Sequence, residues 1–186
     1  MKGINDPRGK LFYNYVNLIR EKKPLFFLAE NVAGIISSQH KPEFLKIIQA
    51  FKEIGYTVSY RLLDAKFYGV PQERQRVIIV GYHEKIGKSF EFPPMSTKLI
   101  TLGETIGNMP APVSAKERNK TNENLIIPNH EYMNGGFSTI YMSRNRVRSW
   151  DEQSYTIQAG GRHAPIHPQA PKMKFIEQDK REFVKG

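Results

Sequence analysis

The run Val77-Ile78-Ile79-Val80-Gly81-Tyr82 is continuously apolar, which is typical of a β-strand that is covered on both faces. A shorter apolar run, Leu25 to Leu28, also predicts a buried strand. Between them, Tyr56 to Leu63 is rich in β-branched and aromatic residues with partial alternation, and predicts a third strand. A chain with these strands must place other elements on the faces of a sheet.

Two segments with helical spacing provide such elements. Lys10 to Lys22 repeats apolar residues at helical intervals and should end before Pro24. Pro42 to Ile54 repeats the pattern, and Gly55 stands where a helix C-cap is expected. The order helix, strand, helix, strand, strand predicts an α/β fold for residues 1–92. The rest of the chain, 93–186, holds eight of the twelve prolines and no long periodic segment, so we expect an irregular second part with short strands.

The charge of the chain favours an anionic partner. Lys and Arg number 28 against 18 for Asp and Glu, a formal net charge of +10, and nucleic acid is the first candidate. Charge alone does not separate this interpretation from a merely soluble basic protein. No apolar run approaches the roughly 20 residues of a membrane span, so we expect no membrane contact and a cytoplasmic location.

The residue types also limit the chemistry. The chain has no cysteine, which excludes disulfides, thiolate metal sites and a thiol nucleophile from this chain. Its five histidines show no i, i+4 pairing on a helical pattern, so we expect no metal site.

Glu30 and Asn31 follow the first predicted strand, in what we expect to be a loop. If the sheet is parallel, ligands gather beyond the carboxyl ends of its strands, which makes both residues candidates for a site. Position alone favours the simpler alternative, a solvated carboxylate at the rim of the sheet.

Two groups of arginines are further candidates. Arg74 and Arg76 would point to one face of an extended segment and could bind a phosphate or a planar acceptor, or could simply be solvated. Arg144, Arg146 and Arg148 alternate in the same way, and Arg162 follows a glycine pair. Such arginines suit the O6 and N7 acceptors of guanine in a major groove, although a nonspecific phosphate-binding patch is the competing interpretation.

Three of these stretches together resemble motifs of the DNA (cytosine-5)-methyltransferase family. Asp6-Pro7-Arg8-Gly9-Lys10-Leu11-Phe12 resembles its fifth motif, Glu30-Asn31-Val32 its sixth, and Gln72-Glu73-Arg74-Gln75-Arg76 its eighth, in the right order. The later half resembles the target-recognition region of bacterial GGCC-specific modification methyltransferases, through Met142-Ser143-Arg144-Asn145-Arg146-Val147, Trp150-Asp151-Glu152-Gln153 and His167-Pro168-Gln169-Ala170-Pro171-Lys172-Met173, among others.

The resemblance implies a fold and an activity. Residues 1–92 would be part of a Rossmann-like S-adenosylmethionine-dependent methyltransferase sheet, and 93–186 a smaller, irregular, mostly β target-recognition domain. The implied reaction is methyl transfer to C5 of a flipped cytosine in a GGCC-like site of double-stranded DNA, within a restriction-modification system.

The resemblance also implies roles for residues. Glu30, in an apolar setting from Phe26, Phe27 and Leu28, would contact N3 and the exocyclic amine of the cytosine, and Asn31 would order the loop around it. Arg76, with Arg74, would position the base or its phosphate. Leu11 would neighbour S-adenosylmethionine, and Arg144, Arg146 and Arg162 would contact DNA.

The sequence departs from the family pattern in one respect that matters for activity. The Phe-x-Gly-x-Gly cofactor loop, the Pro-Cys nucleophile loop and two later motifs are not found in the sequence. We therefore expect a chain that is inactive alone and lacks most of the cofactor site, with a complementary fragment carrying the Pro-Cys loop as a partner. A truncated gene product, a split enzyme and a relic are the alternatives, and a noncatalytic DNA-binding remnant is the alternative function.

Overall fold

The computed structural model describes residues 7–114, 116, 122–128, 130–132, 147–157, 167–169, 172–177 and 180–184. The chain divides into two compact units. The first contains Met1–Asp64 and Gln75–Met95, and the second contains Ala65–Arg74 and Ser96–Gly186. The segment 65–74, which the sequence pattern groups with the α/β part, thus belongs to the second unit.

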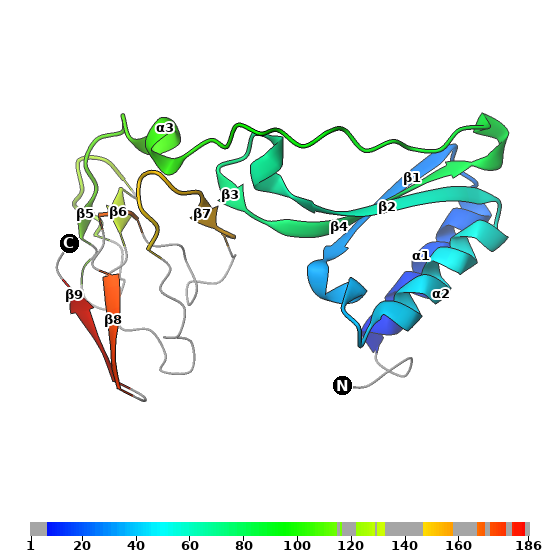
Figure 1. The fold of residues 1–186 in the computed structure, drawn as a ribbon, viewed down its shortest axis with the longest axis horizontal. Helices are drawn as coiled ribbons and strands as arrows, with labels where there is room; N and C mark the ends of the chain where they lie inside the picture. The colour runs from blue at the N-terminus through cyan, green and yellow to red at the C-terminus, as the bar shows by residue number, and fades with distance from the viewer. Residues whose placement is uncertain are drawn as a thin grey trace. The chain divides into compact units, whose positions relative to one another are not determined.

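The first unit is a sheet with helices on one side (Figure 1). Its elements in chain order are α1 (Pro7–Lys22), β1 (Phe26–Val32), the 3₁₀ turn η1 (Ala33–Ile36), α2 (Lys41–Glu53), β2 (Tyr56–Asp64), β4 (Gln75–His83) and η3 (Glu84–Ile86). This arrangement confirms the predicted α/β order. Gly55, with φ of 88°, directly follows the end of α2, as the sequence predicts.

The strand order is β1-β4-β2, and both pairs are antiparallel. The expectation of a parallel sheet is therefore wrong for neighbouring strands. A second correction concerns the end of the first strand: β1 continues to Val32, so Glu30 and Asn31 lie within the strand and not in a loop after it. The ladder from β4 extends to Val32 opposite Arg76, which keeps this segment extended.

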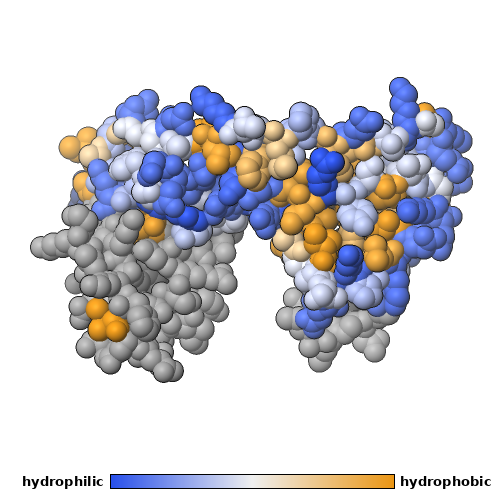
Figure 2. Space-filling model, viewed as in Figure 1, coloured by the Kyte–Doolittle hydropathy of each residue, from blue (hydrophilic) through white to orange (hydrophobic). Residues whose placement is uncertain are grey.

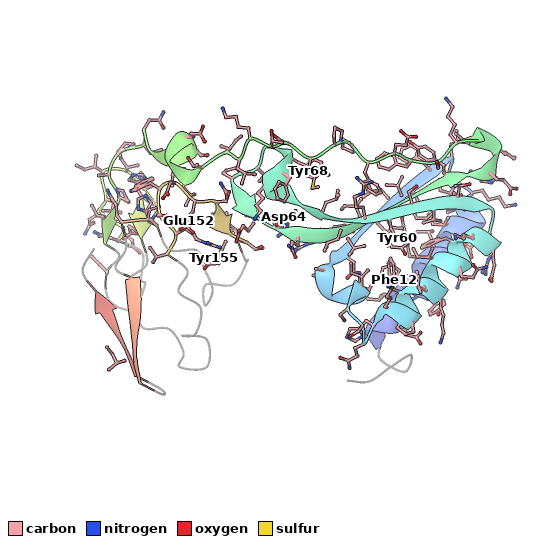
Figure 3. All side chains as sticks on the ribbon, viewed as in Figure 1. Phe12, Tyr60, Asp64, Tyr68, Glu152 and Tyr155 are labelled. Carbon is pink, nitrogen blue, oxygen red and sulfur yellow. The ribbon has the colours of Figure 1, made fainter. Side chains whose placement is uncertain are left out.

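The core lies between the sheet and the two helices. Side chains alternate across a strand, and Phe27, Val77 and Ile79 all point to the helical side, where they are buried. Helix α2 contributes Phe44, Ile47, Ile48 and Phe51, and α1 contributes Val16 and Ile19. Figure 3 shows Phe12 and Tyr60 reaching into this layer, and the Tyr60 ring lies 4.8 Å from that of Phe44.

Gly81 in β4 is required by the close approach of Phe27. A Cβ atom at Gly81 would overlap the ring of Phe27, which packs on this strand from β1. We expect Gly81→Ala to destabilise the first unit by about 1–3 kcal/mol, the usual cost of an overfilled core. Chemical unfolding would measure this change. Gly34→Ala is the matched control because a Cβ there meets no atom within 4 Å, and an equal effect of both substitutions would contradict the packing described.

The second unit is irregular. Its described elements are η2 (Ala65–Tyr68), β3 (Gln72–Glu73), α3 (Leu102–Ile106), β5 (Val113–Ser114), β6 (Glu131–Tyr132), β7 (Ser154–Tyr155), and the hairpin strands β8 (Lys172–Glu177) and β9 (Lys180–Val184). Helix α3 begins with a capping box formed by Thr101 and Glu104. The short paired strands β3 with β7, β5 with β6, and β8 with β9 agree with the irregular, mostly β character that the sequence predicts.

Candidate active site

Glu30 and Arg76 form an ion pair on the sheet face opposite the helices. Glu30 of β1 stands directly across from Ile78, and Arg76 of β4 stands across from Val32, so the two residues are diagonal cross-strand neighbours. Arg76 Nε lies 2.6 Å from Glu30 Oε1. Arg76 also donates from Nη1 to the carbonyl oxygen of Gln75 at 2.8 Å, which holds the guanidinium beside the carboxylate.

The surroundings of Glu30 differ in part from the expected apolar setting. Phe26, Leu28 and Val32 share its face of the strand, whereas Phe27 lies on the opposite face in the core. The three face-sharing side chains are 64%, 59% and 56% exposed. Apolar side chains therefore flank Glu30 along β1, but the described part of the chain leaves them open to solvent. Figure 2 shows exposed hydrophobic residues (orange) among hydrophilic ones (blue) on the first unit.

The other sequence candidates of the first unit lie elsewhere. Asn31 alternates to the helical face, and its Oδ1 accepts a hydrogen bond from the backbone N–H of Val32 at 2.9 Å. Asn31 thus supports the backbone of a strand, and not that of a loop as the sequence predicts. Leu11 lies on α1 and is 63% exposed, so its side chain is open to a ligand or to another chain.

Arg74 belongs to the second unit, unlike Arg76. It lies between β3 and β4, and its carbonyl oxygen accepts a hydrogen bond from Ala65 N–H at 3.0 Å. The structure therefore brings Arg76 to Glu30, whereas Arg74 is part of a turn that closes on the start of η2. The candidate DNA contacts Arg144, Arg146 and Arg162 lie outside the described residues.

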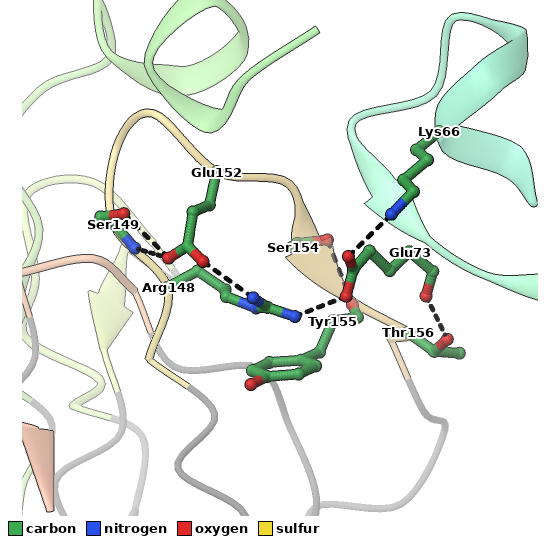
Figure 4. A network of polar contacts seen from close by, with 8 residues as sticks. All are labelled: Lys66, Glu73, Arg148, Ser149, Glu152, Ser154, Tyr155 and Thr156. Atoms are coloured by element: carbon green, nitrogen blue, oxygen red, sulfur yellow. Dashed lines mark hydrogen bonds and ion pairs between the residues drawn. The ribbon is translucent and has the colours of Figure 1, made fainter. Parts of the chain in front are cut away.

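A polar network in the second unit was not predicted from the sequence (Figure 4). Glu73 accepts from Lys66 Nζ at 2.9 Å and from Arg148 Nη2 at 2.5 Å. Arg148 Nη1 also lies 2.8 Å from Glu152 Oε1, and the guanidinium stacks on Tyr155 at 3.9 Å from the ring centre. The one signal of this network in the sequence is that Glu73 is acidic and lies between the candidate polar residues Gln72 and Arg74.

Backbone pairing joins the same two segments. Strand β3 pairs in parallel with β7, with Glu73 opposite Tyr155. Ser154 N–H donates to the Pro71 carbonyl oxygen at 2.9 Å, and Thr156 Oγ1 donates to that of Glu73 at 2.7 Å. The network and the strand pair together fix residues 148–156 against residues 66–73.

The network lowers the pKa of Glu152. The backbone N–H of Ser149, its hydroxyl and the Arg148 guanidinium lower the pKa of Glu152 from 4.5 to about 2. A carboxylate whose folded-state pKa is lowered stabilises the fold above its unfolded pKa, and this contribution is lost as the pH falls. The gain is limited by solvent screening, because the side chain is 40% exposed.

This shift gives a pH prediction. We expect the midpoint of thermal unfolding of the wild type, relative to Glu152→Gln, to fall as the pH is lowered from 4.5 towards 2. Subtracting the unfolding midpoint of the variant from that of the wild type removes the contribution of all other acids, which both proteins share. Parallel curves for the two proteins over this interval would show that the network does not hold Glu152 as the structure describes.

A pocket of about 340 Å³ lies within the second unit. Trp150 and His167 meet edge to face in its wall, with ring centres 5.1 Å apart. His130 contacts the carbonyl oxygen of Pro110. Burial, and then the charge of His130, lower the pKa of His167. Among the described residues, no group of three or more His, Asp or Glu side chains is placed to hold a metal ion.

The comparisons with known proteins concern nearly the whole chain. A family model described as C-5 cytosine-specific DNA methylase matches residues 1–185. Type II methyltransferase M.MthTI of Methanothermobacter thermautotrophicus is 61% identical over 97% of this chain and 55% of its own length. Type II methyltransferase M.FnuDI of Fusobacterium nucleatum is 46% identical over 100% of this chain and 56% of its own length. The chain thus spans about half the length of these curated relatives.

The fold has solved counterparts as well. An E. coli prophage protein described as a DNA modification methyltransferase matches with a TM-score of 0.59 at 19% identity, over 88% of this chain and 60% of that chain. In the part of the chain that the structure describes, no helix is long and apolar enough to cross a membrane. The match of the family model over residues 1–185 and the high identity to these relatives show that the chain belongs to the C-5 cytosine-specific DNA methylase family.

Proposed function

We propose that the chain forms part of a DNA (cytosine-5)-methyltransferase of a restriction-modification system, acting on a cytosine in a GGCC-like duplex site. The observation that carries this proposal is the pair of Glu30 and Arg76, two residues of separate strands whose side chains meet at 2.6 Å. Family membership indicates the class of reaction, and the pair contains the Glu30 carboxylate that would contact the base.

Cytosine C5 is a weak nucleophile, so the base must be activated after it is flipped out of the duplex. A thiolate would add to C6, C5 of the enamine that results would take the methyl group, and loss of the C5 proton and of the thiolate would then restore the C5–C6 double bond. Glu30 would contact N3 and the exocyclic amine, share a proton at N3 as C6 is attacked, and hold the base in place. Arg76 would fix the direction of the Glu30 carboxylate, since its Nε and Nη1 are both engaged beside it.

In this proposal, residues 93–186 recognise the DNA sequence. Arg144, Arg146 and Arg162 would contact DNA, with guanine edges as the best acceptors. Arg74 would contact a phosphate or the base. The net charge of +10 supports binding to a polyanion. The neutralised network around Arg148 contributes nothing to that attraction, which leaves other basic residues to provide it.

Two parts of the reaction come from outside this chain in the proposal. S-adenosylmethionine supplies the methyl group when bound, and the exposed Leu11 fits contact with an apolar part of that cofactor. The thiolate would come from a complementary fragment with the Pro-Cys loop, because the chain has no cysteine. Strand β1 suits such a partner: in the described structure it pairs with β4 alone, and Phe26, Leu28 and Val32 are exposed beside its open edge.

Co-expression tests the proposal. The chain is produced together with segments that supply the Gly-rich loop, the Pro-Cys loop and the C-terminal motifs, in a host without cytosine-5 methylation. We expect 5-methylcytosine in the digested genomic DNA, measured by nucleoside mass spectrometry, and none with either part alone. One second candidate is a noncatalytic DNA-binding protein, which the net charge of +10 supports. Salt-dependent duplex binding without methylation in the co-expression strain would support it.

A further inference from the structure

Arg148 is the one arginine of the series Arg144, Arg146 and Arg148 that the structure describes. Alternation groups it with the other two as a reader of DNA. Its contacts indicate another task. Both terminal nitrogens are engaged by carboxylates, at 2.5 Å by Glu73 and at 2.8 Å by Glu152, and the Tyr155 ring covers one face of the guanidinium. Its side chain is only 21% exposed.

The charge around Arg148 is balanced locally. Lys66 and Arg148 face Glu73 and Glu152, so the positive and negative groups of the network cancel. Two N–H groups of the guanidinium are held by carboxylates, Nε is buried, and the side chain is only 21% exposed, so little of the guanidinium is accessible to a phosphate or to a guanine edge. Arg148 should therefore add nothing to the release of counterions when the chain binds DNA.

The network fixes the residues that directly follow the other two arginines in the sequence. Val147, next to Arg148, is 5% exposed, and Arg146 and Arg144 stand two and four residues before Arg148 in the sequence. On the other side of the network, Glu73 directly precedes Arg74 and is fixed by Lys66 and by the pairing of β3 with β7. The network thus ties Val147 and Arg148 to the turn that carries Arg74.

We propose that Arg148 is a positioning residue for sequence recognition: it is anchored on Glu73 and Glu152 and does not touch DNA itself, whereas Arg144 and Arg146, which precede it in the sequence, contact the DNA. This inference rests on the proposed function, because it requires that the chain prefers GGCC duplexes. It predicts a loss of preference between DNA sequences without a loss of ionic contacts. A residue that contacts phosphate would show the opposite pattern.

The test measures binding of the chain to a GGCC duplex and to a scrambled duplex, by fluorescence anisotropy at several salt concentrations. For Arg148→Met we expect the preference for GGCC to fall about tenfold, comparable to the effect of one mismatched base pair. For Arg148→Met, the slope of log K against log salt should stay at the wild-type value. Lys98→Met removes an exposed cation and is the control for the loss of one positive charge. Circular dichroism confirms that each variant is folded.

Arg148→Lys decides the matter if Arg148→Met does not fold. It keeps the charge, but an ammonium cannot reproduce the fork that reaches two carboxylates, so we expect a several-fold loss of preference at an unchanged slope. Wild-type preference in the folded variants would overturn the inference. So would a slope reduced by about one, because that is the signature of a direct phosphate contact. If the wild type itself shows no preference for GGCC, the proposed recognition function fails before the role of Arg148 is reached.

Discussion

Replacing Glu30 by Gln is expected to lower the rate of cytosine methylation by at least about 100-fold in the complemented enzyme, the usual contribution of a positioned proton-transfer group. Gln keeps the size of the side chain and can still accept a hydrogen bond, but it cannot share a proton with N3 and does not pair with Arg76 as a carboxylate does. Single-turnover transfer of a labelled methyl group to a GGCC duplex measures the rate without interference from product release.

Glu43→Gln is the matched control for this experiment. Glu43 is 41% exposed and forms an ion pair with Lys46 at 2.9 Å, which makes it close to Glu30 in exposure and in partner type. It lies on α2, away from the sheet face that carries Glu30. Equal rates for Glu30→Gln and the wild type would remove Glu30 from the chemistry, and equal losses in both variants would indicate a general effect of charge or folding.

Phe51→Ala is expected to have the largest effect on stability, because the Phe51 side chain is 0% exposed and packs at 4.4 Å between ring centres on Phe27. Truncating a buried phenylalanine costs about 3–5 kcal/mol, a large share of the roughly 5–15 kcal/mol that stabilises a typical domain. We expect the first unit to be mostly unfolded or to unfold at much lower urea concentration.

Leu45→Ala on the same helix is the control. Leu45 is 44% exposed on the outer face of α2, so its truncation should change the free energy of unfolding by no more than about 0.5 kcal/mol. Urea titration followed by far-ultraviolet circular dichroism gives both midpoints at comparable slopes. A small effect of Phe51→Ala would mean that the core between the sheet and the helices is not packed as described.

The sequence predicts elements better than their arrangement. Apolar spacing places the second helix at Pro42 to Ile54, and the structure has it at Lys41–Glu53. Hydrophobic periodicity depends on neighbouring residues only, so it reports the type of an element and its buried face. It carries no information on strand direction, so it could not show that neighbouring strands are antiparallel, or on how far the ladder extends past Leu28.

In the candidate site too, the sequence predicts single residues better than their arrangement. Glu30 and Arg76 could each be named from the resemblance to the methyltransferase family, yet the register of β1 on β4 is needed to bring them together as diagonal neighbours. The pair of Glu73 and Arg148 left only a weak signal, the acidic residue within Gln72-Glu73-Arg74, since opposite charges far apart in a sequence are common and mostly solvated. Arg148 therefore looked like a DNA contact until its carboxylate partners were known.

In the proposed function, this chain provides both the activation of cytosine and the choice of site, while the thiolate comes from another segment. Bisulfite sequencing of genomic DNA from the co-expression strain tests both parts at once. We predict methylated cytosines confined to GGCC sites, present only when both parts are produced, and absent when Glu30 is replaced by Gln. Methylation that is missing in the complete system, or that occurs at the same sites without this chain, would contradict the proposal.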